Sequence, residues 1–353
     1  MKRNILLLFT FFACITVQGQ TPVRLVDLRS EHLDRPIGLD NPVPRLSWRM
    51  EDGRQGAVQT SWRIVVDEDS LNVVNGCGRM WDSGKNDSRN QLVAYAGKKL
   101  QPFTRYYWKV ICSDMEYKET ASPVSYFETG MMGMQHWQGA WIGDGKDIHY
   151  GPAPYFRKEF KTGKKVKSAR AYIAAAGLYE LYINGEKIGD HCLAPLYTRF
   201  DRRNLYVAYD VTSQLQNGDN AIGVLLGNGW YNHQSKAVWD FDRAPWRNRP
   251  TFCLDLRITY TDGSVETIPT DLSWRTASGA ITFNSIYTGE HYDARLEQKG
   301  WSTPEFDDSK WRGVAYRSVP SSNVTAQQVH PIRNVKIFPA VSFPQSGREN
   351  IHL

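Results

Sequence analysis

The sequence has 353 residues, of which 41% are hydrophobic and 12% are aromatic. This composition excludes a disordered chain, and the length suffices for about two domains with cores of their own. Lys and Arg number 43 against 37 Asp and Glu, a mild excess without a long basic cluster, so nothing supports nucleic-acid binding. The mean hydropathy of −0.50 is too polar for a membrane protein.

The first 19 residues have the three parts of a secretory signal peptide. A Lys-Arg pair gives a positive start, an apolar stretch follows over residues 5–17, and Val17 and Gly19 are compact residues at the −3 and −1 positions of a cleavage site. The stretch is too short to anchor the chain across a bilayer. We therefore expect cleavage near Gly19 and a secreted or periplasmic mature chain. Lipidation of Cys14 is the alternative interpretation.

Hydrophobic residues along the mature chain recur with a period of two rather than 3.6. Residues 62–66, 106–112 and 253–260 each alternate apolar with polar side chains, which is typical of strands with one buried and one solvated face. Residues 179–183 lead into Asn184-Gly185, a strong hairpin signal. Convincing amphipathic helices are missing from the pattern. The sequence therefore predicts an all-β protein built of two β-sandwich domains.

Two boundaries are expected from breaks in this pattern. A strand ends at Gly130 and a Met-rich connection follows. At residues 321–323 the period-two alternation becomes weak again. We expect a fibronectin type III-like sandwich over residues 22–130, because residues 100–110 resemble a tyrosine corner with Tyr106 as the corner residue. A second sandwich follows over 135–320, and 321–353 would begin a further β segment.

Several long blocks, in a fixed order, resemble one family. They are Pro44-Arg45-Leu46-Ser47-Trp48, Ala174 to Gly189, Asp210-Val211-Thr212, Gly218 to Tyr231, Ile286 to Leu296, Trp301, and Phe306 to Trp311. Together they resemble the N-terminal half of a secreted bacterial α-L-rhamnosidase, an inverting glycoside hydrolase. The resemblance covers nearly the whole mature chain, and it implies that the second sandwich is a jelly roll.

The resemblance also implies what the chain would do. Members of this family hydrolyse terminal α-L-rhamnosyl residues of glycosides or polysaccharides, and their acid and base carboxylates lie on a later (α/α)6 barrel. Because the chain ends at Leu353, we expect a truncated front half that is inactive alone and whose partners are a rhamnose-containing glycan and the missing barrel. The alternative is a stand-alone carbohydrate-binding module for rhamnose-containing glycans.

Carbohydrate contact is expected in the segment 228–249, which is dense in aromatic, amide and charged side chains. Aromatic rings cover the C–H face of a sugar, and polar neighbours pair with its hydroxyls. The candidates here are Asn228, Trp230, Tyr231, Trp239, Asp240, Asp242, Trp246 and Arg247. Packing against a neighbouring domain is the competing interpretation. An extended backbone would put Asp240 and Asp242 on one side, as in a cation site or a solvated loop, so calcium is the candidate cofactor.

A second group of candidates lies in the block that contains Glu290, Tyr292 and Asp293. These residues either face the substrate cleft of a complete enzyme or belong to a buried Asp–Arg pair that holds a loop. Carboxylate spacing does not single out a catalytic pair anywhere in the chain, so catalytic residues are not assigned. The four cysteines after the signal segment are widely spaced, which favours buried free thiols over disulfides at Cys112 and Cys253.

Overall fold

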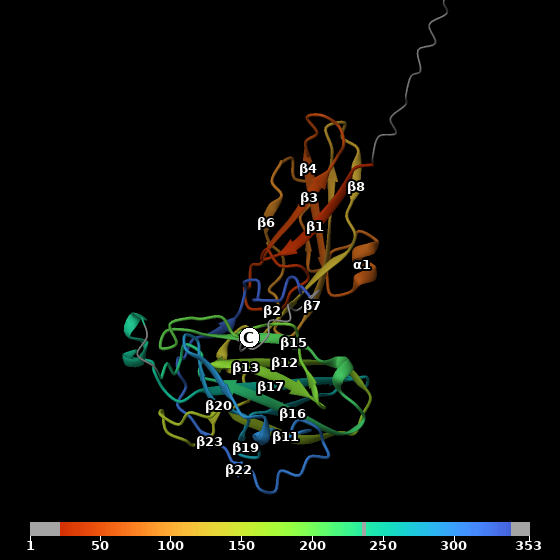
Figure 1. Ribbon diagram of the computed structural model, residues 1–353. Helices are drawn as coiled ribbons and strands as arrows, with labels where there is room; N and C mark the ends of the chain where they lie inside the picture. Colours follow the sequence, from red (N-terminus) through yellow and green to blue (C-terminus); the bar gives the residue numbers. More distant parts are fainter. Residues whose placement is uncertain (1–21, 235–237, 340–353) are drawn as a thin grey trace, which may run out of the picture. The chain divides into compact units, whose positions relative to one another are not determined.

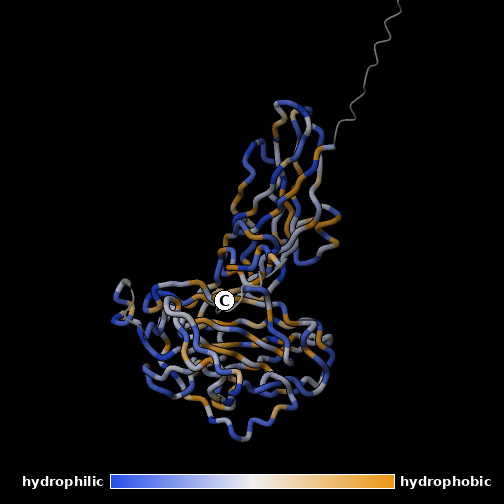
Figure 2. The backbone as a smooth tube through the Cα atoms, in the orientation of Figure 1, coloured by the Kyte–Doolittle hydropathy of each residue, from blue (hydrophilic) through white to orange (hydrophobic). Residues whose placement is uncertain are grey.

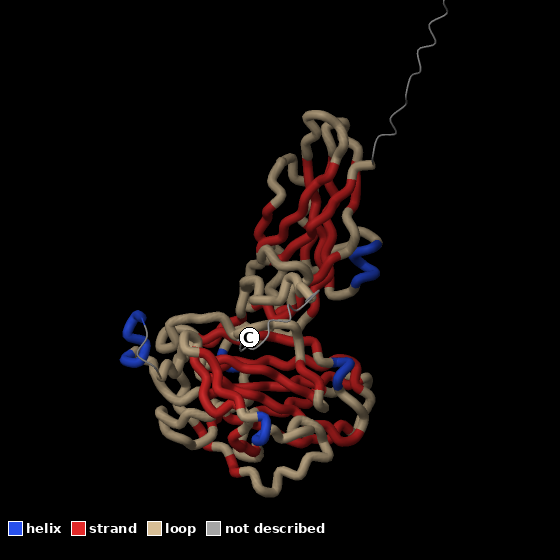
Figure 3. The backbone as a smooth tube through the Cα atoms, in the orientation of Figure 1, coloured by secondary structure: helices blue, strands red, loops and turns tan. Residues whose placement is uncertain are grey.

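The structure is a computed structural model that describes residues 22–234 and 238–339. The predicted signal peptide and Cys14 lie outside these ranges. The described chain is almost entirely strand and loop, with one short α-helix and four 3-10 turns (Figures 1 and 3), so the predicted all-β class is confirmed. None of the described helices is long and apolar enough to cross a membrane.

The chain divides into two compact units. The first contains the residues up to Arg29, Arg45–Lys98 and Tyr107–Ser125, and the second contains Ser30–Pro44, Lys99–Tyr106 and the chain from Tyr126 onward. Residues Ser30–Pro44 therefore belong to the second unit, although they precede most of the first unit in the sequence.

The first unit is formed by short strands and one helical turn. These are β1 (Arg24–Ser30), β3 (Arg45–Glu51), β4 (Ser61–Asp67), α1 (Ser70–Val74), β5 (Trp81–Asp82), β6 (Leu92–Ala94), most of β7 (Arg105–Ser113) and β8 (Glu119–Ala121). One sheet has the order β1-β3-β6, while β4 pairs with β5 and β7, and β7 with β8. Trp62, Ile64 and Val66 are buried as the alternation predicted, and Val65 is buried as well.

The tyrosine corner predicted at Tyr106 is present. Its side chain is fully buried, and its hydroxyl accepts a hydrogen bond from the backbone N–H of Gln101 over 2.8 Å. This bond satisfies a backbone donor beside the start of β7, which is the role of a tyrosine corner in immunoglobulin-like sandwiches.

The second unit is larger. Its elements are β2 (Ile37–Leu39), β9 (Ser125–Thr129), η1 (Met134–His136), β10 (Ile142–Gly143), β11 (Pro154–Thr162), β12 (Val166–Ala176), β13 (Leu178–Ile183), β14 (Glu186–Lys187), β15 (Asn204–Asp210), η2 (Thr212–Gln214), β16 (Gly218–Gly227), η3 (Val238–Arg243), β17 (Thr251–Tyr260), β18 (Val265–Pro269), β19 (Arg275–Ser278), β20 (Ile281–Ser285), β21 (Gly289–Tyr292), η4 (Ala294–Leu296), β22 (Arg312–Gly313), β23 (Ala315–Tyr316) and β24 (Val324–Ala326).

Two sheets of the second unit face each other across a hydrophobic core. One has the order β23-β10-β17-β12-β15-β24 with β18 on β17, the other has the order β14-β13-β16-β11-β19-β22, and β20 and β21 form a separate hairpin. Ile173 and Leu254 from the first sheet pack with Leu181 and Val224 from the second. Figure 2 shows apolar segments running along these strands and polar ones in the surrounding loops. The arrangement is a β-sandwich.

Strand β13 follows the predicted alternation. Tyr179, Leu181 and Ile183 are buried in the core, whereas Leu178, Glu180 and Tyr182 are half-exposed on the outer face of the sheet. The predicted hairpin follows, because Ile183 pairs with Glu186 across Asn184-Gly185, and both turn residues have positive φ.

Strand β17 differs from its predicted form. Leu254, Leu256 and Ile258 are buried as expected. On the face predicted to be solvated, Cys253 and Asp255 are buried too, each 2% exposed, whereas Arg257 and Thr259 are half-exposed. A second cluster of buried residues, which includes Tyr172 and Tyr231, covers this face. The alternation of polar and apolar residues could not reveal that cover, because it comes from distant segments.

The carboxylate of Asp40 joins three segments of the second unit. It accepts hydrogen bonds from the Tyr206 hydroxyl over 2.6 Å and from the backbone N–H groups of Met132 and Ala326, each over 2.8 Å. Burial raises the pKa of this carboxyl, and these three donors oppose the rise. Strand β24, which contains Ala326, pairs in parallel with β15.

Candidate functional site

A groove of about 590 Å³ lies on the outer face of the sheet that contains β13. Its floor consists of Leu178, Glu180 and Tyr182 from β13, with Leu225 from β16 and Tyr155 from β11. The hairpin β20–β21 forms a wall, to which it contributes Ile281, Asn284, Glu290 and Tyr292. The period-two alternation creates this floor, because the residues between them on β13 point into the core.

Two glycines on β16 leave room for neighbouring side chains on this face of the sheet. Gly223 pairs with Tyr182, and a Cβ at this glycine would lie 2.5 Å from the ring of Trp301. Gly227 pairs with Leu178, and its Cβ would lie 3.3 Å from the amide oxygen of Asn284. A larger residue at Gly223 would therefore displace Trp301.

Trp301 occupies the space above Gly223 and joins an aromatic platform. Its ring stacks on Tyr155 with 4.6 Å between the ring centroids and meets Tyr182 edge-on at 5.1 Å. Tyr155 also stacks at 6.3 Å on Trp311. Of these rings, Tyr155 and Tyr182 line the groove, and Trp301 supports them.

The carboxylate of Glu180 is engaged at both oxygens. One oxygen forms an ion pair with Lys187, and the other accepts a hydrogen bond from the Tyr182 hydroxyl over 2.6 Å. Burial, followed by this hydrogen bond, raises the pKa of Tyr182, so its hydroxyl stays protonated. Lys187 supplies a compensating positive charge, and Glu180 remains able to accept a further hydrogen bond from a ligand.

The hairpin wall carries the predicted residues Glu290 and Tyr292. Both are exposed, and both line the groove. The Tyr292 hydroxyl donates to Glu297, which raises the pKa of Tyr292 to about 12. The structure therefore brings these two candidates together with Glu180.

Asp293 forms the predicted pair with Arg295, at 2.8 and 2.7 Å. The pair is not buried as one interpretation expected, because the Arg295 side chain is 88% exposed. Asp293 also accepts a hydrogen bond from the backbone N–H of Arg295 at the start of η4. Hydrogen bonding to Arg295 lowers the pKa of Asp293, so this carboxylate is ionised and holds a surface turn.

Asn228 lies behind the groove wall rather than in the groove. It is 2% exposed, its backbone N–H donates to the Asn284 amide oxygen over 2.7 Å, and its side-chain amide donates to the Asn284 carbonyl over 3.1 Å. Trp230 contacts Tyr287, between β20 and β21, with ring centroids 5.2 Å apart. These two predicted residues therefore position the hairpin.

The other aromatic candidates pack mainly within the second unit. Tyr231 is 4% exposed and contacts Phe200, while Trp230 and Trp246 belong to one cluster with Tyr197. The indole N–H of Trp246 donates to the carbonyl of Trp230 over 3.4 Å. Much of the aromatic density in this segment therefore stabilises the fold.

The turn that contains Trp239, Asp240 and Asp242 is not extended. Trp239 and Asp240 have φ values of 74° and 51°, within the 3-10 turn Val238–Arg243, so the side-by-side carboxylates expected of an extended strand do not form. The carbonyl of Asp242 accepts from Arg247, which also donates to Asn232. Among the residues that the structure describes, His, Cys, Asp and Glu side chains do not gather in threes at a metal-binding distance. Trp239 is 79% exposed.

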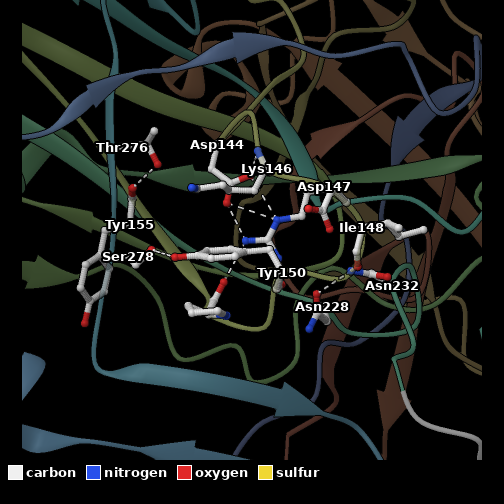
Figure 4. Close-up of polar contacts among 12 residues, drawn as sticks. Asp144, Lys146, Asp147, Ile148, Tyr150, Tyr155, Asn228, Asn232, Thr276 and Ser278 are labelled. Atoms are coloured by element: carbon white, nitrogen blue, oxygen red, sulfur yellow. Dashed lines mark hydrogen bonds and ion pairs between the residues drawn. The ribbon is translucent and has the colours of Figure 1, made fainter.

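Arg249 is a structural residue that the candidate set omitted. It is 2% exposed, pairs with Asp144 over 2.6 Å, and donates to the carbonyls of Tyr150 and Pro152. Figure 4 shows Tyr150 reaching Ser278 beside this network, and Asn232 bonded to both Ile148 and Asn228. Asn232 and Arg249 therefore fix the loop that leads to Ala153, at the edge of the groove.

Sequence reasoning missed Tyr155, Tyr182 and Asn284 as groove residues. A signal was present for Tyr182. It shares the solvated face of residues 178–183 with Glu180, and it lies two residues before the Asn184-Gly185 turn. Asn284 gave no such signal, because its partner Asn228 is 56 residues away.

Two family models match the chain in succession. The Rha78A-like, N-terminal immunoglobulin domain matches residues 25–133, and the α-L-rhamnosidase N-terminal domain matches residues 164–336. An α-L-rhamnosidase of Formosa agariphila is 33% identical over 364 residues, which are 95% of this chain and 38% of that protein.

Solved structures agree. The α-L-rhamnosidase of Dictyoglumus thermophilum is 38% identical with a TM-score of 0.82, over 89% of this chain and 36% of that one. The α-L-rhamnosidase of Streptomyces avermitilis, solved in complex with L-rhamnose, shares the fold with a TM-score of 0.83 at 24% identity, over 89% of this chain and 47% of that one.

The succession of an immunoglobulin-like domain and a larger β-sandwich matches the N-terminal regions of glycoside hydrolases. Within that class, the chain belongs to the α-L-rhamnosidase family and corresponds to its N-terminal part. It spans 38% of the Formosa agariphila relative.

Proposed function

We propose that this chain is the N-terminal region of an exported α-L-rhamnosidase that acts on rhamnose-containing glycans. The observation that carries the proposal is the succession of two rhamnosidase N-terminal domains over residues 25–133 and 164–336. The apolar residues 5–17 support export. Sequencing the N-terminus of the protein recovered outside the cytoplasm tests this part, with a start near Gln20 expected.

We propose that the chain by itself does not hydrolyse glycosides, because the family resemblance assigns the acid and base carboxylates to a later (α/α)6 barrel. Inverting hydrolysis needs one carboxylic acid and one carboxylate base about 6.5–9.5 Å apart. In the groove, both oxygens of Glu180 are engaged by Lys187 and Tyr182, which suits hydrogen bonding rather than proton donation.

A chromogenic α-L-rhamnoside tests this part of the proposal. The purified chain and its Glu180→Gln and Glu290→Gln variants are expected to release the chromophore at the same background rate. Turnover by the wild-type chain that either variant lowers 100-fold or more would contradict it.

A second candidate function is binding of L-rhamnosyl residues by the chain itself, which the groove favours. It combines aromatic rings, carboxylates and apolar side chains in one concavity, and sugars need these three kinds of contact. Calorimetric titration with L-rhamnose, once with calcium and once with a chelator, tests this function. Absence of heat under both conditions would eliminate it.

A further inference from the structure

We propose that the groove between β13 and the hairpin β20–β21 binds one 6-deoxyhexopyranose in a defined orientation and without a metal ion. The hydroxyl groups would lie toward Glu180 and Tyr182, and the C5 methyl group toward Leu178. The inference rests on the sugar-binding function proposed above and assigns to it a location, an orientation and independence of metal ions.

The two ends of the groove differ in chemistry. Leu178 pairs with Gly227, and the residue after Gly227 is bonded to Asn284, so the start of β13 faces the hairpin turn. Tyr179 pairs with Ala194, which brings Leu193 to this same end. Leu193 is 53% exposed. This end of the groove is therefore lined by the branched apolar side chains of Leu178 and Leu193, beside the amide of Asn284.

The other end is polar and aromatic. Tyr182 pairs with Gly223, four residues along β16 from Gly227, which is about 13 Å at the usual rise of a strand. The Glu180 carboxylate lies between these ends, bonded to the Tyr182 hydroxyl. Tyr155 pairs with Leu225, as Glu180 does from the other side, and Trp301 contacts the rings of both Tyr155 and Tyr182. Such a floor is long enough for one pyranose ring with its substituents.

A sugar with one apolar corner fits this gradient. A 6-deoxyhexose has a methyl group on C5 and hydroxyl groups on the opposite side of the ring. A methyl group gains free energy when it leaves water for an apolar surface, whereas a hydroxymethyl group there loses its hydrogen bonds. Leu178 should therefore discriminate between L-rhamnose and L-mannose, which differ only in this group.

Charge balance in the groove argues against a bridging cation. Lys187 already pairs with Glu180, and the Tyr182 hydroxyl occupies the other oxygen. A calcium ion needs six to eight oxygen ligands, mostly carboxylates and carbonyls. Sugar hydroxyls can instead donate directly to Glu180 and Glu290.

Titration of the full chain with L-rhamnose and with L-mannose tests the proposal. The wild-type chain is expected to bind L-rhamnose about tenfold more tightly than L-mannose, and equally in calcium and in chelator. Glu180→Gln should weaken binding of both sugars about tenfold. Leu178→Ala should leave L-mannose binding within about twofold and bring the two affinities together.

Each variant is compared with the wild type by circular dichroism and thermal unfolding, so that loss of fold is recognised. Trp239→Ala, on the exposed turn outside the groove, probes the competing location. L-rhamnose binding that needs calcium, or that Trp239→Ala abolishes and Glu180→Gln leaves intact, overturns the groove assignment and leaves the binding function in place. Absence of wild-type binding to either sugar overturns both.

Discussion

Asp255 is a buried carboxylate on β17, only 2% exposed to solvent. Its two oxygens accept hydrogen bonds from the backbone N–H groups of Gln138 and Gly139, at 2.8 and 2.7 Å. Burial raises its pKa from the ordinary 3.8 to about 6, and these bonds only partly oppose that rise. A charged residue on the alternate face of β17 predicted solvent there, but that face is covered.

Asp255→Asn should change how stability depends on pH. The pKa is higher in the folded state than in the unfolded state, so the folded protein binds the proton more tightly. This contribution to stability is present below about pH 4 and is lost as the pH rises through 6. As the pH rises through this range, the free energy of unfolding of the wild type should fall by on the order of 3 kcal/mol relative to that of Asp255→Asn. Urea unfolding at several pH values measures the difference.

Asp240→Asn is the matched control, because Asp240 is exposed. The difference in free energy of unfolding between Asp240→Asn and the wild type should stay constant over the same pH range. A constant free-energy difference between wild type and Asp255→Asn from pH 4 to 7 would show that Asp255 does not titrate there.

At the level of elements, strands and hairpins were more predictable than the distant segments that pack against them. Residues 179–183 and Asn184-Gly185 behave as the pattern indicated, because alternation and turn chemistry are local. The groove needed Asn228 to meet Asn284, and Trp301 to lie over Gly223. Such pairings between distant segments leave no periodic trace in one sequence.

Gly223→Ala should disturb the aromatic platform. The new Cβ would lie 2.5 Å from Trp301, so the indole must move away from Tyr155, at a cost of about 1–3 kcal/mol. We expect a lower melting temperature and a changed near-ultraviolet circular dichroism spectrum. Gly313→Ala is the control, because nothing lies within 4 Å of its Cβ position. Equal spectra for Gly223→Ala and wild type would contradict the stacking.

Arg249→Met should loosen the loop that leads to Ala153. Removing the arginine leaves Asp144 buried and unpaired, which costs about 3–5 kcal/mol. Hydrogen exchange of residues 144–152 should become faster than in the wild type. The double variant Asp144→Leu/Arg249→Met should be more stable than Arg249→Met, since it buries no unpaired charge. If the double variant is the less stable one, the ion pair is not the source of the effect.

At the scale of the molecule, the described residues are held by packed cores, and their four cysteines are free. Cys112 and Cys253 are buried, as the strand patterns predicted, and burial raises the pKa of both thiols, to about 12 for Cys112. Membership of the rhamnosidase family was also predictable, because long blocks keep their order. Sugar contact in 228–249 stays a prediction, and Trp230, Tyr231 and Arg247 of this segment contact other residues of the second unit.

Alkylation of the native protein should follow this difference in burial. Cys77 is exposed and Cys192 half-exposed, so both should be modified within minutes, whereas Cys112 and Cys253 should react only after denaturation. Peptide mass spectrometry assigns each site, and reductant should leave the melting temperature unchanged. Rapid labelling of Cys253 in the native state would contradict its burial.

Asp40 has a consequence for how this protein can be divided and recombined. The carboxylate comes from the N-terminal part of the chain, yet its three donors are Tyr206, Met132 and Ala326. A fragment that starts at residue 135 would retain Tyr206 and Ala326 and lose their acceptor. Gene fusion or domain exchange of the larger sandwich should therefore carry residues 30–44 with it, so that Tyr206 and Ala326 keep their acceptor.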